Sequence, residues 1–262
     1  MDCRVKPGND GFRLVTIALA LWLLPLAPAH AGNESDFLAG RSKACAKCSL
    51  PAAALKRKDL SDAELSGANL SAAVMHRARL TRAKLAGADL TNANLNKTDL
   101  KSASFAGAKL EEAMLYESDA SAADFSGADL TGAKLQRSRL IRATFDGAKL
   151  AGALLTGARL DEASLRAADL SAANLVEATL RRANLEGANL NNAGLIDAVL
   201  REANLKGANL SEADLFGADL TGADLAGADL SDSRLTRAIL TGANLEGAKL
   251  KGALMPDGSV HE

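Results

Sequence analysis

The sequence predicts an all-β solenoid, a rod made of short stacked coils, and two observations lead to that fold class. Leucine recurs at almost every fifth position from Leu55 to Met255, and alanine stands two positions earlier in nearly every unit. No inserted residue interrupts this phase. A fixed short period indicates a repeat architecture, because one unit can bury its apolar side chains only by stacking on its neighbours.

The five-residue period fits neither regular secondary structure. Apolar faces recur near every 3.6 residues in helices and every 2 in strands, so leucines spaced by five would drift around a helix. Glycine often follows the leucine by two positions, as at Gly67 and Gly87, and glycine is costly inside helices. We therefore expect a chain that turns a corner every five residues, with leucine and alanine inward and the other three residues outward.

The repeated units GADL, GANL and GAKL, seen in GANLSEADLFGADLTGADLAGADL at 207–230, resemble the pentapeptide repeat family, whose pattern is A-(D/N)-L-x-x. The resemblance covers about three quarters of the chain. It implies a right-handed quadrilateral β-helix with four repeats in each coil. At roughly 4.8 Å between stacked strands, about ten coils would give a rod roughly 50 Å long.

The first 31 residues are typical of a secretory signal peptide. Basic residues precede an apolar run at 15–29, and Ala29-His30-Ala31 fits a cleavage site. The alternative is a retained membrane anchor, but the run is short and two prolines interrupt it. We therefore expect an exported protein, periplasmic or secreted, with a membrane contact only if this segment is not cleaved. Cleavage would remove three of the 31 basic residues and two of the 32 acidic ones. The remaining 28 basic and 30 acidic residues give a net charge of about −2.

Residues 32–52 are expected to form an N-terminal cap containing Cys45 and Cys48. In an oxidising compartment a pair at this spacing is expected to form a tight disulfide. The alternatives are a reduced pair, a redox-active CxxC motif or a metal site. A haem attachment would need histidine at Ser49, and zinc needs four ligands. Cysteines ahead of the first coil also occur in the resembled family, which favours a capping role.

The repeat region at 53–255 contains no loop, whereas catalytic residues usually lie on loops held by a scaffold. The chain has no glycine-rich phosphate loop, and its histidines are too few for a triad. The Asp and Asn residues before leucine belong to the repeat, so they indicate no acid–base chemistry. We therefore expect no enzyme, no cofactor and no metal. Residues 256–262, which follow Met255 with a Pro-Asp-Gly turn signal, are expected to close the rod.

With four repeats per coil, residues 20 apart are stacked neighbours, and outward apolar residues then gather near one corner. A contiguous apolar patch can mark a partner site. The alternative is that branched and aromatic residues simply suit a strand surface. The interaction candidates are Tyr116, Val176, Ile196, Val199, Phe216 and Ile239.

Two further surfaces follow from the same stacking. One side is basic, but interleaved acidic residues favour a solvated salt-bridge surface over a site for anions, lipid surfaces or polysaccharides. Its arginines, the weak anion-binding candidates, are Arg139, Arg142, Arg159, Arg181, Arg182 and Arg201. One corner is nearly all glycine, with Ala167 as the exception, and turn chemistry explains it better than docking.

The leading functional hypothesis is a non-enzymatic exported rod that presents a rigid surface to another protein or an envelope component, with a homodimer possible. A redox-active CxxC protein is one alternative. The other is a topoisomerase-protecting DNA mimic, as in some members of the resembled family. A DNA mimic needs a strongly negative surface and a location in the cytoplasm. The near-neutral net charge and the signal segment therefore disfavour this hypothesis. No nucleic-acid partner is expected.

Overall fold

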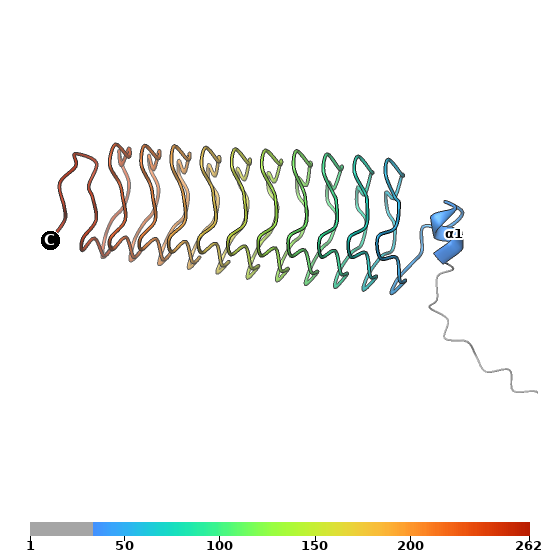
Figure 1. Ribbon diagram of the computed structural model, residues 1–262. Coiled ribbons are helices and arrows are strands. Elements are labelled where there is room, and N and C mark those ends of the chain that lie inside the picture. Colours follow the sequence, from blue (N-terminus) through green and yellow to red (C-terminus); the bar gives the residue numbers. More distant parts are fainter. Residues whose placement is uncertain (1–33) are drawn as a thin grey trace, which may run out of the picture.

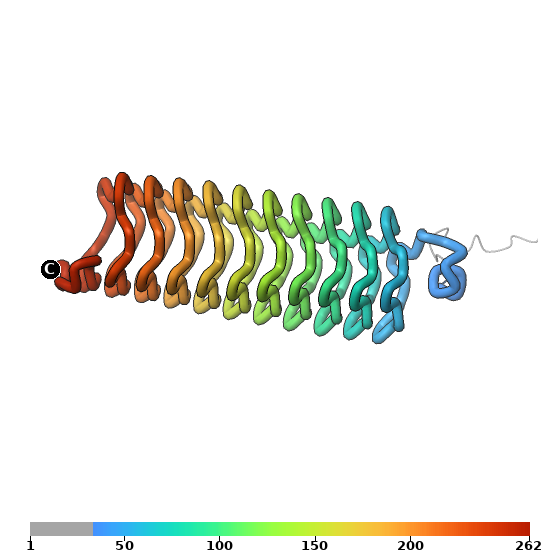
Figure 2. Tube along the Cα trace, turned by 90° about the horizontal axis from the view of Figure 1, so that it is seen from above, coloured from blue at the N-terminus to red at the C-terminus, as the bar shows by residue number. Residues whose placement is uncertain are grey.

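The computed structural model describes residues 34–262, and these form a straight rod of stacked coils with one short helix at its N-terminal end (Figure 1). The helix is α1 (Glu34–Leu38). From Ala44 onward, isolated parallel bridges join each strand residue to the residue 20 positions later, ending with Arg234 and Leu254. Viewed from above, the coils repeat with nearly constant spacing along the rod (Figure 2). The predicted four-sided β-helix is confirmed.

Every corner of the rod is a tight turn that brings the leucine and the next alanine inward. In one example the N–H of Ala68 donates to the carbonyl of Leu65 at 3.0 Å, and Gly67 between them has a φ of 65°. A positive φ at the third residue is the mark of a type II turn. Adjacent coils are joined by ladder bonds such as Leu65 N–H to the carbonyl of Lys84, at 2.8 Å.

The glycine-rich corner has the backbone conformation that turn chemistry predicts. Its glycines have positive φ, as at Gly187 with 65°, and the exceptional Ala167 has a φ of 51°. At the other corners the equivalent turn position holds mostly non-glycine residues with similar φ values, and a glycine in some coils. Each of these costs about 1–2 kcal/mol relative to a relaxed backbone, and the ladder holds them in place.

The core is a set of continuous columns of inward side chains. The central leucines from Leu65 to Leu235 are fully buried. Phe105, Phe125 and Phe145 replace leucine in three successive coils, and their rings stack with centroids 4.9 and 4.8 Å apart and planes within 4°. The ring spacing equals the strand spacing of about 4.8 Å, so the coil repeat itself sets the stacking.

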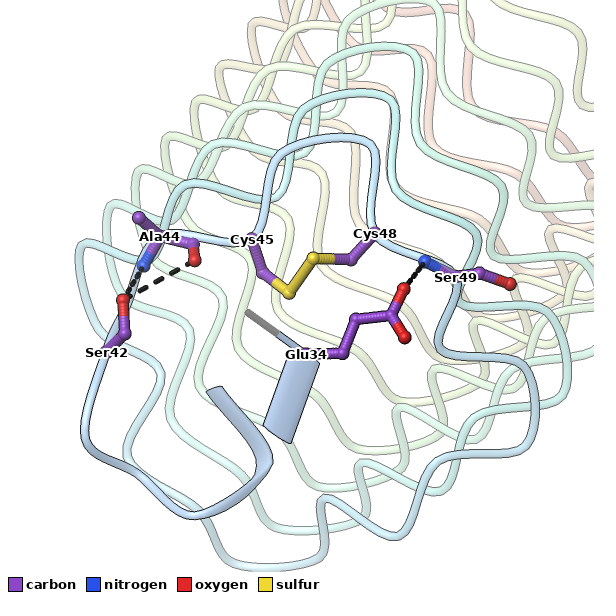
Figure 3. Close-up of a disulfide and its surroundings, with 6 residues drawn as sticks. All are labelled: Glu34, Ser42, Ala44, Cys45, Cys48 and Ser49. Carbon is purple, nitrogen blue, oxygen red and sulfur yellow. Dashed lines mark hydrogen bonds between the residues drawn. A yellow bond between two sulfur atoms is a disulfide. The ribbon is translucent and has the colours of Figure 1, made fainter. Parts of the chain in front are cut away.

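The N-terminal end differs from the expected cap at 32–52, because the first coil begins inside that range. The ladder starts at Ala44, so Cys45 occupies a leucine-type inward position and Cys48 an alanine-type one. The structure joins them by a disulfide with an S–S distance of 2.05 Å (Figure 3). It spans a corner turn, in which the Cys48 N–H donates to the Cys45 carbonyl at 3.2 Å.

Helix α1 covers this end of the core. Phe37 is buried, and the Glu34 carboxylate accepts the N–H of Ser49 at 2.7 Å (Figure 3). Both cysteines are also buried, with at most 5% exposure. Redox-active thiols lie in partly exposed, electropositive surroundings, so this burial counts against the redox hypothesis.

At the C-terminal end the chain turns back on itself after Met255. Val260 pairs antiparallel with Leu254, and the N–H of His261 donates to the carbonyl of Ala253 at 2.9 Å. This tail covers one side of the last coil, while Leu240 and Leu245 on other sides are half-exposed.

The predicted signal segment at 1–31 lies outside the described residues. Across 34–262, no helix has the length and apolarity needed to cross a bilayer. In the same range, no group of His, Cys, Asp and Glu side chains is arranged to hold a metal ion.

Candidate interaction surfaces

The apolar corner consists of Val176, Ile196 and Phe216, which lie in three successive coils at one corner of the rod and are half-buried. Each is the second residue of its turn and follows the inward leucine. The side-chain oxygens of Asn174 and Asp214 accept the N–H groups of Val176 and Phe216, both at 3.1 Å, and so fix two of these turns. The repeat therefore places the three apolar side chains in register on a rigid frame.

Gly194 leaves a notch beside this corner. It occupies the strand position that is Asn174 and Asp214 in the neighbouring coils, so Ile196 has no such side chain before its turn. Among the described glycines, only Gly194 has no positive φ, so the turn geometry does not require it. A Cβ placed there would meet only the Val176 Cγ2, at 4.0 Å. Glycine in a strand interior often marks a close approach by another group.

Two arginines lie over the ring of Phe216. The guanidinium carbon of Arg234 is 4.4 Å from the ring centroid, and that of Arg237 is 5.5 Å away. Arg234 also pairs with Asp214 at 3.3 Å. Cations over an aromatic face attract it electrostatically, so these contacts orient the Phe216 ring and add positive charge to one end of the apolar corner.

The structure does not bring the other apolar candidates into this corner. Tyr116 lies in the same column but three coils away, with polar residues between. Val199 and Ile239 lie on the adjoining side, where Asp219 separates them in the ladder. Ile239 is the more exposed, at 46%. The predicted set thus divides into one contiguous corner and three isolated residues.

The basic side is largely neutralised by its own carboxylates. Arg142 pairs with Glu162 at 2.7 Å and Arg182 with Glu202 at 2.8 Å, each across one coil. Hydrogen bonding to Arg142 holds the pKa of the Glu162 carboxyl below its usual range, and the pKa of Glu202 is lowered in the same way by Arg182. These exposed pairs form the solvated surface that the interleaved charges indicate.

The remaining members of the basic side follow the same pattern, with one exception. Arg159 and Arg181 both contact Asp161, at 3.7 and 3.4 Å. Arg201 pairs with Asp219 at 2.5 Å. Arg139 has no ion pair within residues 34–262. A shallow depression on this side is lined by three arginines and three carboxylates, which leaves no net charge to attract an anion.

A basic group that sequence reasoning missed lies near the N-terminal end. Lys56 and His76 are stacked neighbours at one corner, and Arg57 and Arg77 follow them in the next column. The N–H of Arg57 donates to the carbonyl of His76 at 3.1 Å, which shows that the two turns adjoin. The sequence contains a signal that could have identified this group. Its basic residues stand 20 positions apart in two columns, and none of the four positions holds a carboxylate. We call these four residues the N-terminal basic corner.

Comparison with known families decides the identity of the fold. A family profile described as Pentapeptide repeats, with eight copies, matches residues 59–96, 83–119, 123–161, 163–198, 193–232 and 218–255. The chain belongs to the pentapeptide repeat family. The fold of this pentapeptide repeat protein is accordingly the right-handed quadrilateral β-helix that the sequence predicts. Proteins of this family are generally structural or interaction proteins.

Several solved pentapeptide repeat proteins resemble the chain. HetL, involved in heterocyst differentiation regulation in the cyanobacterium Nostoc sp. strain PCC 7120, is 40% identical, with 74% of this chain and 91% of HetL covered and a TM-score of 0.37. Rfr23 from the cyanobacterium Cyanothece 51142 is 38% identical over 42% and 64% of the two chains, with a TM-score of 0.24.

QnrB1, a plasmid-mediated fluoroquinolone resistance protein, is 22% identical, with 71% of this chain and 86% of QnrB1 covered and a TM-score of 0.36. At this identity and score the likeness to QnrB1 carries no argument about function. No curated protein sequence matches the chain.

Proposed function

We propose that this pentapeptide repeat protein is a non-enzymatic, exported rod whose apolar corner docks another protein or an envelope component. The observation that carries the proposal is Gly194, a glycine that its backbone conformation does not require, which lies beside half-buried Val176 and two residues before Ile196. The resulting notch can receive one apolar side chain from a partner.

The energetics favour a small but well-defined contact. Burying one aliphatic side chain in such a notch contributes about 1.5–3 kcal/mol. The ladder already fixes the backbone around the notch, so binding would order few additional groups, and ordering is a main cost of association. Phe216 is held by two arginines and can act as the second anchor, because aromatic residues and arginine are enriched at binding hot spots.

Filling the notch should separate binding from stability. Gly194→Val is expected to leave the melting temperature unchanged or raised, because the position has room and valine suits a strand better than glycine. The same change should weaken partner capture at least tenfold. The measurements are thermal unfolding by circular dichroism and quantitative affinity capture from the native host, followed by titration of each captured partner.

The matched control is Ala151→Val, which places a valine side chain at a half-buried outward position away from the apolar corner. It should bind as the unmodified protein does. If Gly194→Val binds every partner with unchanged affinity, the notch is not the docking site. Sedimentation of both variants would identify a second copy of the chain as the partner, because only Gly194→Val would shift the dimer towards monomer.

Export has a separate test. Fractionation of the native host with intact-mass measurement is expected to find the chain outside the cytoplasm, beginning at Gly32. Its mass should be lower by two hydrogens, for a Cys45–Cys48 disulfide. A cytoplasmic chain that keeps residues 1–31 and two free thiols would contradict this part of the proposal.

A further inference from the structure

Charged residues on this rod generally stack with alternating sign. Because residues 20 apart lie about 4.8 Å apart, a charge of the same sign above or below is unfavourable and one of opposite sign is favourable. The chain uses the favourable arrangement along most of its length. The pairs include Asp62 with Arg82, Lys97 with Glu117, Arg142 with Glu162, Arg166 with Glu186 and Lys249 with Asp229.

The N-terminal basic corner breaks this rule. Arg77 stacks on Arg57, and His76 on Lys56, so two columns begin with residues that carry no negative charge. Within residues 34–262, no carboxylate lies at ion-pairing distance from any of the four. Lys97, the next residue above Arg77, pairs with Glu117 on its far side, at 3.1 Å. The corner therefore lacks the internal neutralisation of those opposite-charge pairs.

The two sides beside this corner differ in character. On one side lie uncharged residues, among them Val74, which is 40% exposed. Leu38 of α1, 39% exposed, is held near the corner because Lys58 Nζ donates to its carbonyl. On the other side the carboxylates are occupied, since Asp59 pairs with Lys43 at 3.8 Å.

Asp99 lies two coils above Asp59 in the same column, beyond Arg79. Its carboxylate is likewise paired, with Lys101 at 3.5 Å. The N-terminal basic corner thus combines unpaired cations with the two large apolar side chains that are exposed near this end of the rod. The other large exposed apolar residues of the described chain, Ile239, Leu254 and Val260, lie at the opposite end.

We propose that the N-terminal basic corner docks on an anionic lipid surface, with its arginines on headgroup phosphates and Val74 and Leu38 at the interface. Stable attachment to a membrane surface generally takes two signals, and here basic charge and exposed apolar residues lie side by side. This surface lies at the far end of the rod from the apolar corner, so the inference does not depend on the proposed function.

The position of the corner in the chain favours a membrane over a soluble polyanion. The apolar run ends at Ala29 and α1 begins at Glu34, so four residues separate them and the five Cα–Cα steps span at most roughly 18 Å. As long as the run is attached and contacts a bilayer, this end of the rod is held close to the headgroups. After cleavage before Gly32, the corner's own charges and exposed apolar side chains make the contact. The basic corner faces outward at that end.

Vesicle binding by the full chain tests the proposal. Flotation with phosphatidylcholine vesicles, alone or mixed with phosphatidylglycerol, separates the charge-dependent contact from any insertion of the apolar run. Arg57→Asn with Arg77→Asn is expected to lower the partition onto anionic vesicles about 30-fold and leave neutral vesicles unaffected, since each basic residue near the surface contributes about fivefold. Asparagine fits these turns, because Asn92 and Asn192 hold the equivalent position with φ of 58° and 56°.

Arg142→Asn with Arg182→Asn is the matched control, since it removes the same charge from the same turn position where both arginines are already paired. It should bind anionic vesicles as the unmodified chain does. The proposal is overturned if the control loses as much binding as the test variant, or if the unmodified chain does not prefer anionic vesicles. It is also overturned if Arg57 and Arg77 affect binding to heparin but not to vesicles, which would assign the corner to a soluble polyanion.

Discussion

Replacing Phe125 by alanine is expected to lower the free energy of unfolding by about 3–5 kcal/mol. The Phe125 ring is fully buried and stacks on Phe105 below and Phe145 above. Its removal takes contacts from both neighbours and opens a cavity that the hydrogen-bonded ladder prevents from collapsing. Urea unfolding followed by circular dichroism measures the loss.

Phe125→Leu is the control for this change, because leucine is the usual residue at this inward position. It should lose less than about 1.5 kcal/mol, the usual limit for a hydrophobic exchange of similar volume. If alanine is tolerated as well as leucine, the aromatic column does not stabilise the middle of the rod.

Replacing Ala172 by proline is expected to destabilise the rod by about 3 kcal/mol or more. Ala172 has a φ of 54°, whereas proline requires about −65°, and its N–H donates to the carbonyl of Asn191 at 2.9 Å. Both the turn and one ladder bond would be lost. Because each coil contacts only its neighbours, we expect unfolding to separate into two steps on either side of this coil.

Ala172→Gly should act in the opposite direction and stabilise the protein by up to about 1 kcal/mol, because glycine relieves the left-handed conformation at a smaller entropic cost. The Ala172 side chain makes no polar contact, so the comparison isolates the backbone. Equal stability of the proline and glycine variants would contradict the type II turn at this corner.

The fold could be predicted from the sequence because the inward positions repeat without interruption, and each inward residue has the same surroundings. The start of the first coil was missed for a physical reason. Cys45 and Cys48 fill the leucine and alanine positions, but half-cystines do not resemble leucine and alanine in the repeat pattern. The pattern therefore placed the boundary too late.

The surfaces were less predictable, because outward side chains are not constrained by the repeat. Stacking at a spacing of 20 correctly gathered Val176, Ile196 and Phe216, yet the notch at Gly194 depends on a φ that the sequence does not display. On the basic side, the sequence showed mixed charges but not which partner each arginine takes. The sequence prediction missed the unpaired Arg57 and Arg77. Arginines are denser on the basic side, and the sequence does not show which arginines lack an ion pair.

The uninterrupted five-residue phase also links the two ends of the molecule. The apolar corner and the N-terminal basic corner share one edge of the rod, since His76 and Ile196 lie in the same column. Inserting 20 residues between them would add a coil and keep both on that edge. Inserting five would leave every leucine buried but turn all later surfaces by a quarter of a revolution. The core accommodates either insertion equally well. The number of repeats between the two surfaces therefore sets the direction in which one faces relative to the other.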